Sequence, residues 1–125
     1  MISRKFSVSE VLKILDLDDK FHQIDVNLHD LEKIEHLLGP FLDDCQNSSP
    51  SFGELITLAK EYNGILECYI TGTNRDDCRM SCEGIVLRNV TQLDMIELVN
   101  SWHSSDELHL SVELNGNFRI RLWWD

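Results

Sequence analysis

Positive charge is scarce in this sequence of 125 residues. Eleven lysines and arginines stand against twenty-two aspartates and glutamates, which gives a formal net charge of −11. DNA, RNA and anionic membranes carry charge of the same sign and would repel such a chain. We therefore expect no direct binding of nucleic acid or membrane, and we expect any partner attracted by charge to be basic.

Long apolar runs are also missing. No stretch approaches the roughly 20 apolar residues of a membrane span. The opening residues, MISRKFSVSE, carry two positive charges but lack the apolar run of a secretory signal. We therefore expect a cytoplasmic protein whose four cysteines are free and mostly buried thiols in a reducing compartment: Cys45, Cys68, Cys78 and Cys82.

Known catalytic signatures are absent as well. The sequence contains no phosphate-binding loop, dinucleotide fingerprint, nucleophile elbow or zinc-protease helix. Cys78 and Cys82 are four residues apart, and no second short-spaced cysteine pair completes a zinc site. His29 and His36 would lie about 10.5 Å apart along one helix, too far to share an ion. We expect no metal, no cofactor and no enzymatic activity.

The pattern of apolar residues predicts one α+β domain over residues 1–125. Helical spacing predicts helices over residues 8–17, 27–38, 51–62 and 92–102, the last of them largely buried. Alternation predicts strands over 65–71, 79–88, 106–114 and 118–124, with 21–26 as a further short strand. Each helix begins at a capping pair: Ser7 with Glu10, Asn27 with Asp30, Ser51 with Glu54, and Thr91 with Asp94. The expected order is three helices followed by β-β-α-β-β, with an antiparallel sheet of about four strands packed by helices.

The last two strands must be joined by a loop that keeps their apolar faces together. A two-residue loop at Asn115-Gly116 would place the two apolar faces on opposite sides of the sheet. A three-residue loop brings even-numbered residues opposite even-numbered ones. Residues 114–116 would put Gly116 in the left-handed conformation, whereas residues 115–117 would pair Glu113 with Arg119; both alternatives stay open.

Two adjacent tryptophans close the chain and point to opposite faces of the final strand. Trp124 shares a face with Phe118 and Ile120, so we expect it in the core. Trp123 lies on the face of Arg119 and Arg121. That face is either a half-exposed surface where tryptophan packs on arginine stems, or a contact surface for a partner.

Negative charge is concentrated in residues 16–44, which we call the acidic segment. It holds nine carboxylates against two lysines, and therefore −7 of the total charge. One interpretation is a solvated helix face with a charged loop, and the other is a patch that attracts a basic partner. The candidate partner-binding residues are Asp18, Asp19, Asp25, His29, Glu32, His36 and Asp43, together with Trp123.

These features favour a small acidic cytoplasmic binding module that neutralises a basic protein, such as a nuclease toxin or a nucleic-acid-binding protein. An immunity protein is one example, by analogy of size and charge alone. An alternative is a nucleic-acid mimic of the kind that phage use against restriction or CRISPR systems, which requires carboxylates spaced like phosphates. A third possibility is an enzyme or a subunit of an assembly.

Overall fold

The computed structural model describes residues 2–20, 22–45, 48–102 and 104–124. The α+β class is confirmed, and the sheet has five strands. In chain order the elements are α1 (Arg4–Ile14), β1 (His22–Val26), α2 (Leu28–Ile34), the short 3-10 helices η1 (Glu35–Leu37) and η2 (Gly39–Phe41), α3 (Phe52–Tyr62), β2 (Ile65–Thr71), β3 (Arg79–Val90), α4 (Gln92–Ser101), β4 (Glu107–Val112) and β5 (Phe118–Trp123).

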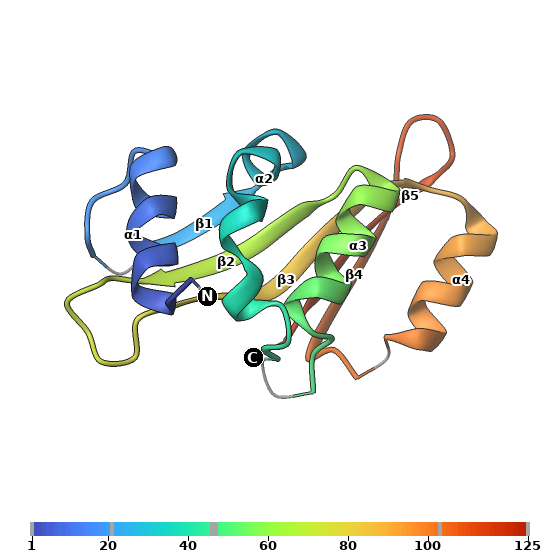
Figure 1. Cartoon of the computed structure of the whole chain (residues 1–125). Helices are drawn as coiled ribbons and strands as arrows, with labels where there is room; N and C mark the ends of the chain where they lie inside the picture. Colours follow the sequence, from blue (N-terminus) through green and yellow to red (C-terminus); the bar gives the residue numbers. More distant parts are fainter. Residues whose placement is uncertain (1, 21, 46–47, 103, 125) are drawn as a thin grey trace.

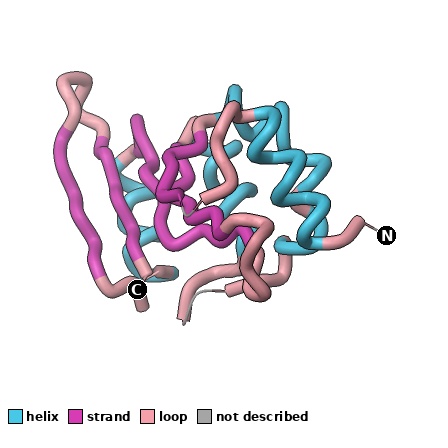
Figure 2. Tube along the Cα trace, turned by 90° about the vertical axis from the view of Figure 1, so that its left-hand side faces the viewer, coloured by secondary structure: helices cyan, strands magenta, loops and turns pink. Residues whose placement is uncertain are grey.

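The strands form a single antiparallel sheet in the order β1-β2-β3-β5-β4. The helices lie along one face of this sheet (Figure 1). Seen from the side, the strands form one layer and the helices lie beside it (Figure 2). We call the other side of the sheet the open face. Strands β1 and β4 are the two edges of the sheet.

Strand β1 supplies the fifth strand and confirms the short strand expected around residues 21–26; residue 21 lies outside the described residues. Ile24 and Val26 alternate with polar residues, so their side chains point to the helical side. There they lie opposite Cys68 and Leu66 of β2. This strand separates the first two helices in sequence, where we expected three consecutive helices.

A single cluster of buried apolar side chains joins the helices to the sheet. Each helix contributes a stripe of apolar side chains to this cluster, and the strands contribute side chains mostly from alternate residues. The fully buried members with the largest side chains are Trp124, Phe41, Phe52, Leu31, Ile34, Leu38, Leu55, Leu66, Ile70, Met80, Ile85 and Leu87. The expectation that Trp124 belongs to the core is therefore confirmed.

The first helix begins four residues earlier than its periodicity suggested. Ser3, not Ser7, is the capping residue, and its hydroxyl accepts a hydrogen bond from the Phe6 N–H. Ser7 lies inside the helix, where it is buried and donates a hydrogen bond to the Leu37 carbonyl. The capping box expected between Ser7 and Glu10 is therefore wrong. The other three caps are confirmed, at Asn27, Ser51 and Thr91.

The closing hairpin has the three-residue loop over residues 114–116. The Glu113 N–H donates to the Asn117 carbonyl at 2.7 Å, which closes the loop. Gly116 has a φ of 84°, in the left-handed region that glycine adopts without strain. Val112 lies opposite Phe118, so even-numbered residues meet across the strands as expected. The alternative loop over 115–117, with Glu113 opposite Arg119, is wrong.

The expectation that α4 is largely buried is wrong. Leu98 is its one buried residue, while Leu93 and Ile96 are exposed. Figure 1 shows α4 at the end of the row of helices, where it has a neighbouring helix on one side only. Its contact with the core includes an edge-to-face pair between Trp102 and Trp124, with ring centroids 6.5 Å apart. The broad apolar surface of α4 therefore faces solvent over part of its circumference.

Candidate partner-binding surfaces

Three aspartates of the acidic segment line a hollow beside the edge strand β1. The hollow has a volume of about 250 Å³ and lies where α1 ends, against β1 and α2. We call it the acidic groove. Its lining residues are Ile14, Leu15, Asp16, Leu17, Ile24, Asp25, Asp30 and Lys33. Apolar side chains therefore form much of its wall, and three carboxylates and one ammonium lie around them.

The local backbone explains how the three carboxylates come together. Asp16 follows the end of α1 with a φ of 56°, a left-handed conformation that turns the chain towards β1. Asp25 lies on β1 opposite Glu67, so it borders both the groove and the open face. Asp30 lies in the first turn of α2, where the Asn27 side chain accepts a bond from its backbone N–H.

Within the described part of the chain, these carboxylates have no bonded partner. No described residue forms an ion pair or a side-chain hydrogen bond with the carboxylates of Asp16, Asp25 or Asp30. Of these three, only Asp25 is among the candidate residues predicted from the sequence. Asp16 falls at the end of the helix predicted over residues 8–17 and Asp30 in a predicted capping pair, and no sequence signal places them beside Asp25.

Asp18 and Asp19 have a different role, because both already have partners within the chain. Asp18 accepts a hydrogen bond from His22 Nε2 at 2.8 Å. Asp19 accepts hydrogen bonds from the hydroxyl and the backbone N–H of Thr73, which tie the α1–β1 loop to the β2–β3 loop. These bonds lower the pKa of Asp19. The space beside it is closed, since a Cβ added at Gly72 would lie 2.5 Å from Asp19 Oδ1.

Four further candidates lie on the outer side of the helical layer. His29 and Glu32 are exposed on α2, His36 is exposed on η1, and Asp43 is exposed after η2. Their surroundings are partly neutralised by neighbouring pairs. Lys60 donates to Glu35 at 2.7 Å, and Arg4 donates to both carboxylate oxygens of Asp44 at 2.9 and 3.0 Å. The acidic segment is therefore less negative on this side than its composition suggests.

Trp123 lies on the open face, with two strands between its own strand β5 and β1. The Arg121 guanidinium lies 5.2 Å from its ring centroid, and the Tyr69 ring packs edge-on at 6.5 Å. Beneath it, a Cβ added at Gly84 would lie 2.7 Å from Trp123 Cε3. Glycine at this position therefore leaves room for the indole beside β3, where Trp123 is half-buried.

The arginine beside Trp123 is held by carboxylates of the open face. Arg121 donates to Glu67 from two nitrogens, at 2.8 and 3.1 Å, and a third contact reaches Glu107 at 3.5 Å. The Glu67 carboxylate raises the pKa of Arg121. This pairing compensates the positive charge of Arg121 beside Trp123. The structure thus separates Trp123 from the acidic groove.

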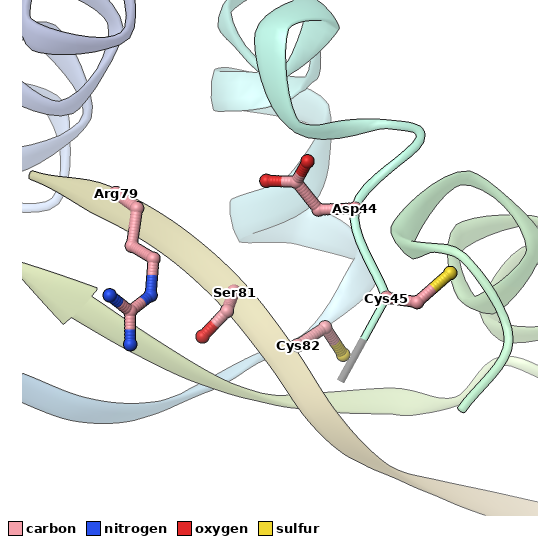
Figure 3. A pocket seen from close by; sticks show the side chains of 5 residues that line it. All are labelled: Asp44, Cys45, Arg79, Ser81 and Cys82. Atoms are coloured by element: carbon pink, nitrogen blue, oxygen red, sulfur yellow. The ribbon is translucent and has the colours of Figure 1, made fainter. Parts of the chain in front are cut away.

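A second hollow, of about 190 Å³, lies beside the first half of β3 (Figure 3). Arg79, Ser81 and Cys82 reach it from the strand, and Asp44 and Cys45 from the loop after η2. Its charged residues are already paired, Arg79 with Asp77 and Asp44 with Arg4. The described part of the chain contains no group of three or more His, Cys, Asp or Glu residues that could hold a metal ion.

Comparison of the chain with protein-family models, curated proteins and solved structures found no match in any of the three. Within residues 2–20, 22–45, 48–102 and 104–124, no helix has the length and apolar character needed to cross a bilayer.

Proposed function

We propose that the protein binds a basic partner protein and neutralises it, with the acidic groove as the anchor of the interface. The observation that supports this proposal is a partly apolar hollow whose lining includes Asp16, Asp25 and Asp30 against one lysine, Lys33. A lysine or arginine side chain fits both parts of such a site. Its aliphatic stem would pack against apolar walls, and its charged head would meet the carboxylates.

The remaining negative charge would act over a longer range. A net charge of −11 attracts a basic protein during diffusion, which speeds association. This attraction weakens as salt is added, because the Debye length shrinks from about 10 Å at 0.1 M to about 3 Å at 1 M. The exposed residues Glu32 and Asp43 would contribute to this field without contacting the partner directly.

Nucleases and other nucleic-acid-binding proteins are the partner class that we favour, because their binding surfaces are basic. On this proposal the protein is an inhibitor of the immunity type, and it acts in the cytoplasm. The free thiols agree with a reducing compartment: Cys68 and Cys82 lie opposite each other on β2 and β3 and are not joined.

Capture from an extract of the protein's own cells tests the proposal. We expect the captured protein to be basic and its association rate to fall at least about tenfold between 0.05 and 0.5 M salt. The double reversal Asp25→Lys and Asp30→Lys should weaken binding and lower the melting temperature only modestly, because Asp25 is exposed while Asp30 is half-buried in the first turn of α2. The matched control, Glu61→Lys with Asp76→Lys, adds the same charge at exposed sites away from the groove and should weaken binding less.

Three outcomes would contradict this function. They are an acidic partner, an association rate indifferent to salt, and equal effects of the groove and control reversals. Displacement of the protein from its partner by duplex DNA would favour the nucleic-acid mimic, because the two ligands would then share one basic surface. Turnover of a small molecule by the purified protein would favour the enzyme alternative.

A further inference from the structure

The edge strand β4 has little of the usual protection against pairing with another chain, since its one charged side chain is that of Glu107 at its first residue. Among the described strands its single neighbour is β5, with which it pairs without a register shift over the six residues ELHLSV. Natural edge strands are usually guarded by lysine, proline, a bulge or a covering element. The strand contains neither lysine, arginine nor proline, and its ladder has no bulge.

The direction of the backbone groups shows which residues could pair across this edge. The Glu113 N–H donates to Asn117 across the hairpin, and bonded pairs alternate along an antiparallel ladder. Odd-numbered residues of β4 therefore bond to β5. The N–H and C=O groups of Leu108, Leu110 and Val112 point away from β5, towards the free edge.

Apolar side chains are also exposed along this edge. Leu110 and Val112 are 46% and 68% exposed, and Leu114 in the hairpin loop is fully exposed. Leu93 and Ile96 of the adjacent region α4 are exposed too. Five of the nine large exposed apolar residues in the described chain thus belong to α4 and the hairpin. Such a concentration is typical of a surface that is covered by a partner.

We propose that β4 pairs antiparallel with β4 of a second copy, about a two-fold axis that passes beside Ser111. The five-stranded sheet then continues across the axis into the sheet of the other copy. Leu110 of each copy lies opposite Val112 of the other, and these residues exchange backbone hydrogen bonds. The same surface serves on both sides, as a two-fold interface requires.

The charges favour this register over the neighbouring ones. With Ser111 on the axis, His109 faces Glu113 of the second copy, whose carboxylate is bonded to Arg88 and the Asn89 N–H of its own chain, so no like charges are brought together there. With Leu110 on the axis, Glu107 would face Glu113, and like charges directly opposite each other destabilise a sheet. With His109 on the axis, the two imidazoles would face each other and Val112 would lose its apolar neighbour.

Salt should affect this association in the opposite direction from binding of a basic partner. Two chains of −11 repel each other, and this repulsion weakens as the Debye length shrinks. The apolar contacts do not weaken with salt. The dimer should therefore become tighter as sodium chloride is added.

Sedimentation equilibrium of the purified protein tests the proposal. We expect the mass to rise from 14.5 kDa towards twice that value with protein concentration, and more readily at high salt. Leu110→Lys should raise the dissociation constant at least about tenfold, because the change occurs twice in each dimer. Phe6→Lys, at an equally exposed apolar residue of α1, should leave it unchanged.

Cysteine cross-linking tests the register. In a Cys45→Ser background, which removes the exposed native thiol, Ser111→Cys should form a disulfide between two copies when oxidised glutathione is added. Opposed residues of an antiparallel pair have Cβ atoms close enough for this bond. His109→Cys lies two residues away on the same face of β4, so the two introduced thiols would not be opposite each other and should cross-link much more slowly. A mass of one chain at all concentrations and salts, or faster linking through residue 109, would overturn the proposal.

Discussion

Replacement of Trp124 can separate two opposing effects of its buried indole ring on the stability of the fold. The side chain is fully buried and packs edge-on against Trp102. Its indole Nε1–H has no acceptor among the described residues, although the side chain is enclosed. The backbone N–H of Trp124 donates to Glu83 at 2.7 Å and is not altered by a change of side chain. The ring therefore stabilises the fold by packing, while its polar group opposes that effect.

The magnitudes follow from these two contributions. Trp124→Ala leaves a large cavity and should lower the free energy of unfolding by roughly 3–5 kcal/mol. Trp124→Phe removes fewer atoms and also removes the buried donor, whose burial without a partner costs about 1–3 kcal/mol. The two effects of the phenylalanine variant largely cancel. We therefore expect it to be within about 1 kcal/mol of the natural protein.

Urea unfolding followed by far-ultraviolet circular dichroism measures both values without relying on tryptophan fluorescence. Trp123→Ala is the matched control, because the same residue type lies half exposed on the open face. Loss of its contacts with Arg121 and Tyr69 should cost about 1–2 kcal/mol. An alanine variant of Trp124 that loses less than about 1 kcal/mol would refute the packing argument. A phenylalanine variant as unstable as the alanine variant would show that the indole N–H is bonded.

Two further predictions concern the other elements of the sheet. Gly84→Ala should lower the free energy of unfolding in urea by about 1–3 kcal/mol, because the added Cβ would lie 2.7 Å from Trp123. Gly39→Ala is the control: a Cβ added at Gly39 meets no atom within 4 Å, so this variant should keep nearly the same stability. The Asn89 N–H and a neighbouring guanidinium lower the pKa of Glu113 below its ordinary 4.5. Its contribution to stability is therefore present above pH 4.5 and is lost as pH falls through the lower folded-state pKa. Glu113→Gln should flatten the dependence of stability on pH below 4.5, and an unchanged slope would contradict this.

Helix caps and the alternation of apolar residues were enough to predict those elements that are determined by residues close together in the sequence. The capping box of Ser51 and Glu54 places the start of α3, and both of its hydrogen bonds are present. Matching of apolar faces excluded the two-residue loop at Asn115-Gly116, although that dipeptide is the strongest short hairpin signal. This argument succeeds because shifting the pairing of a strand by one residue would turn all of its apolar side chains away from the core.

The start of α1 required information from a distant part of the chain. Ser3 and Ser7 are equally good capping residues, and Glu10 completes a capping pattern only with Ser7. The hydroxyl of Ser7 is instead satisfied by the Leu37 carbonyl, thirty residues away. Neither helix propensity nor the spacing of capping residues can predict that tertiary hydrogen bond, so the sequence alone favoured Ser7 as the capping residue.

The same limit applies to the acidic segment. Composition predicted its charge, but contacts with other segments decide which carboxylates remain free. Asp19 is held by Thr73, Glu35 by Lys60 and Asp44 by Arg4. Asp16 and Asp30, which the sequence places in a predicted helix and a predicted capping pair, line the groove instead.

The two proposed interfaces lie at opposite edges of the sheet, β1 and β4, so occupation of one leaves the other free. Pairing through β4 would place one acidic groove at each far end of the extended sheet. The two associations then differ in their response to salt, because one joins opposite charges and the other joins like charges. At low salt a basic partner should bind to a largely monomeric protein. At high salt the dimer should persist while partner binding weakens, so a salt series that follows mass and partner binding together separates the two surfaces.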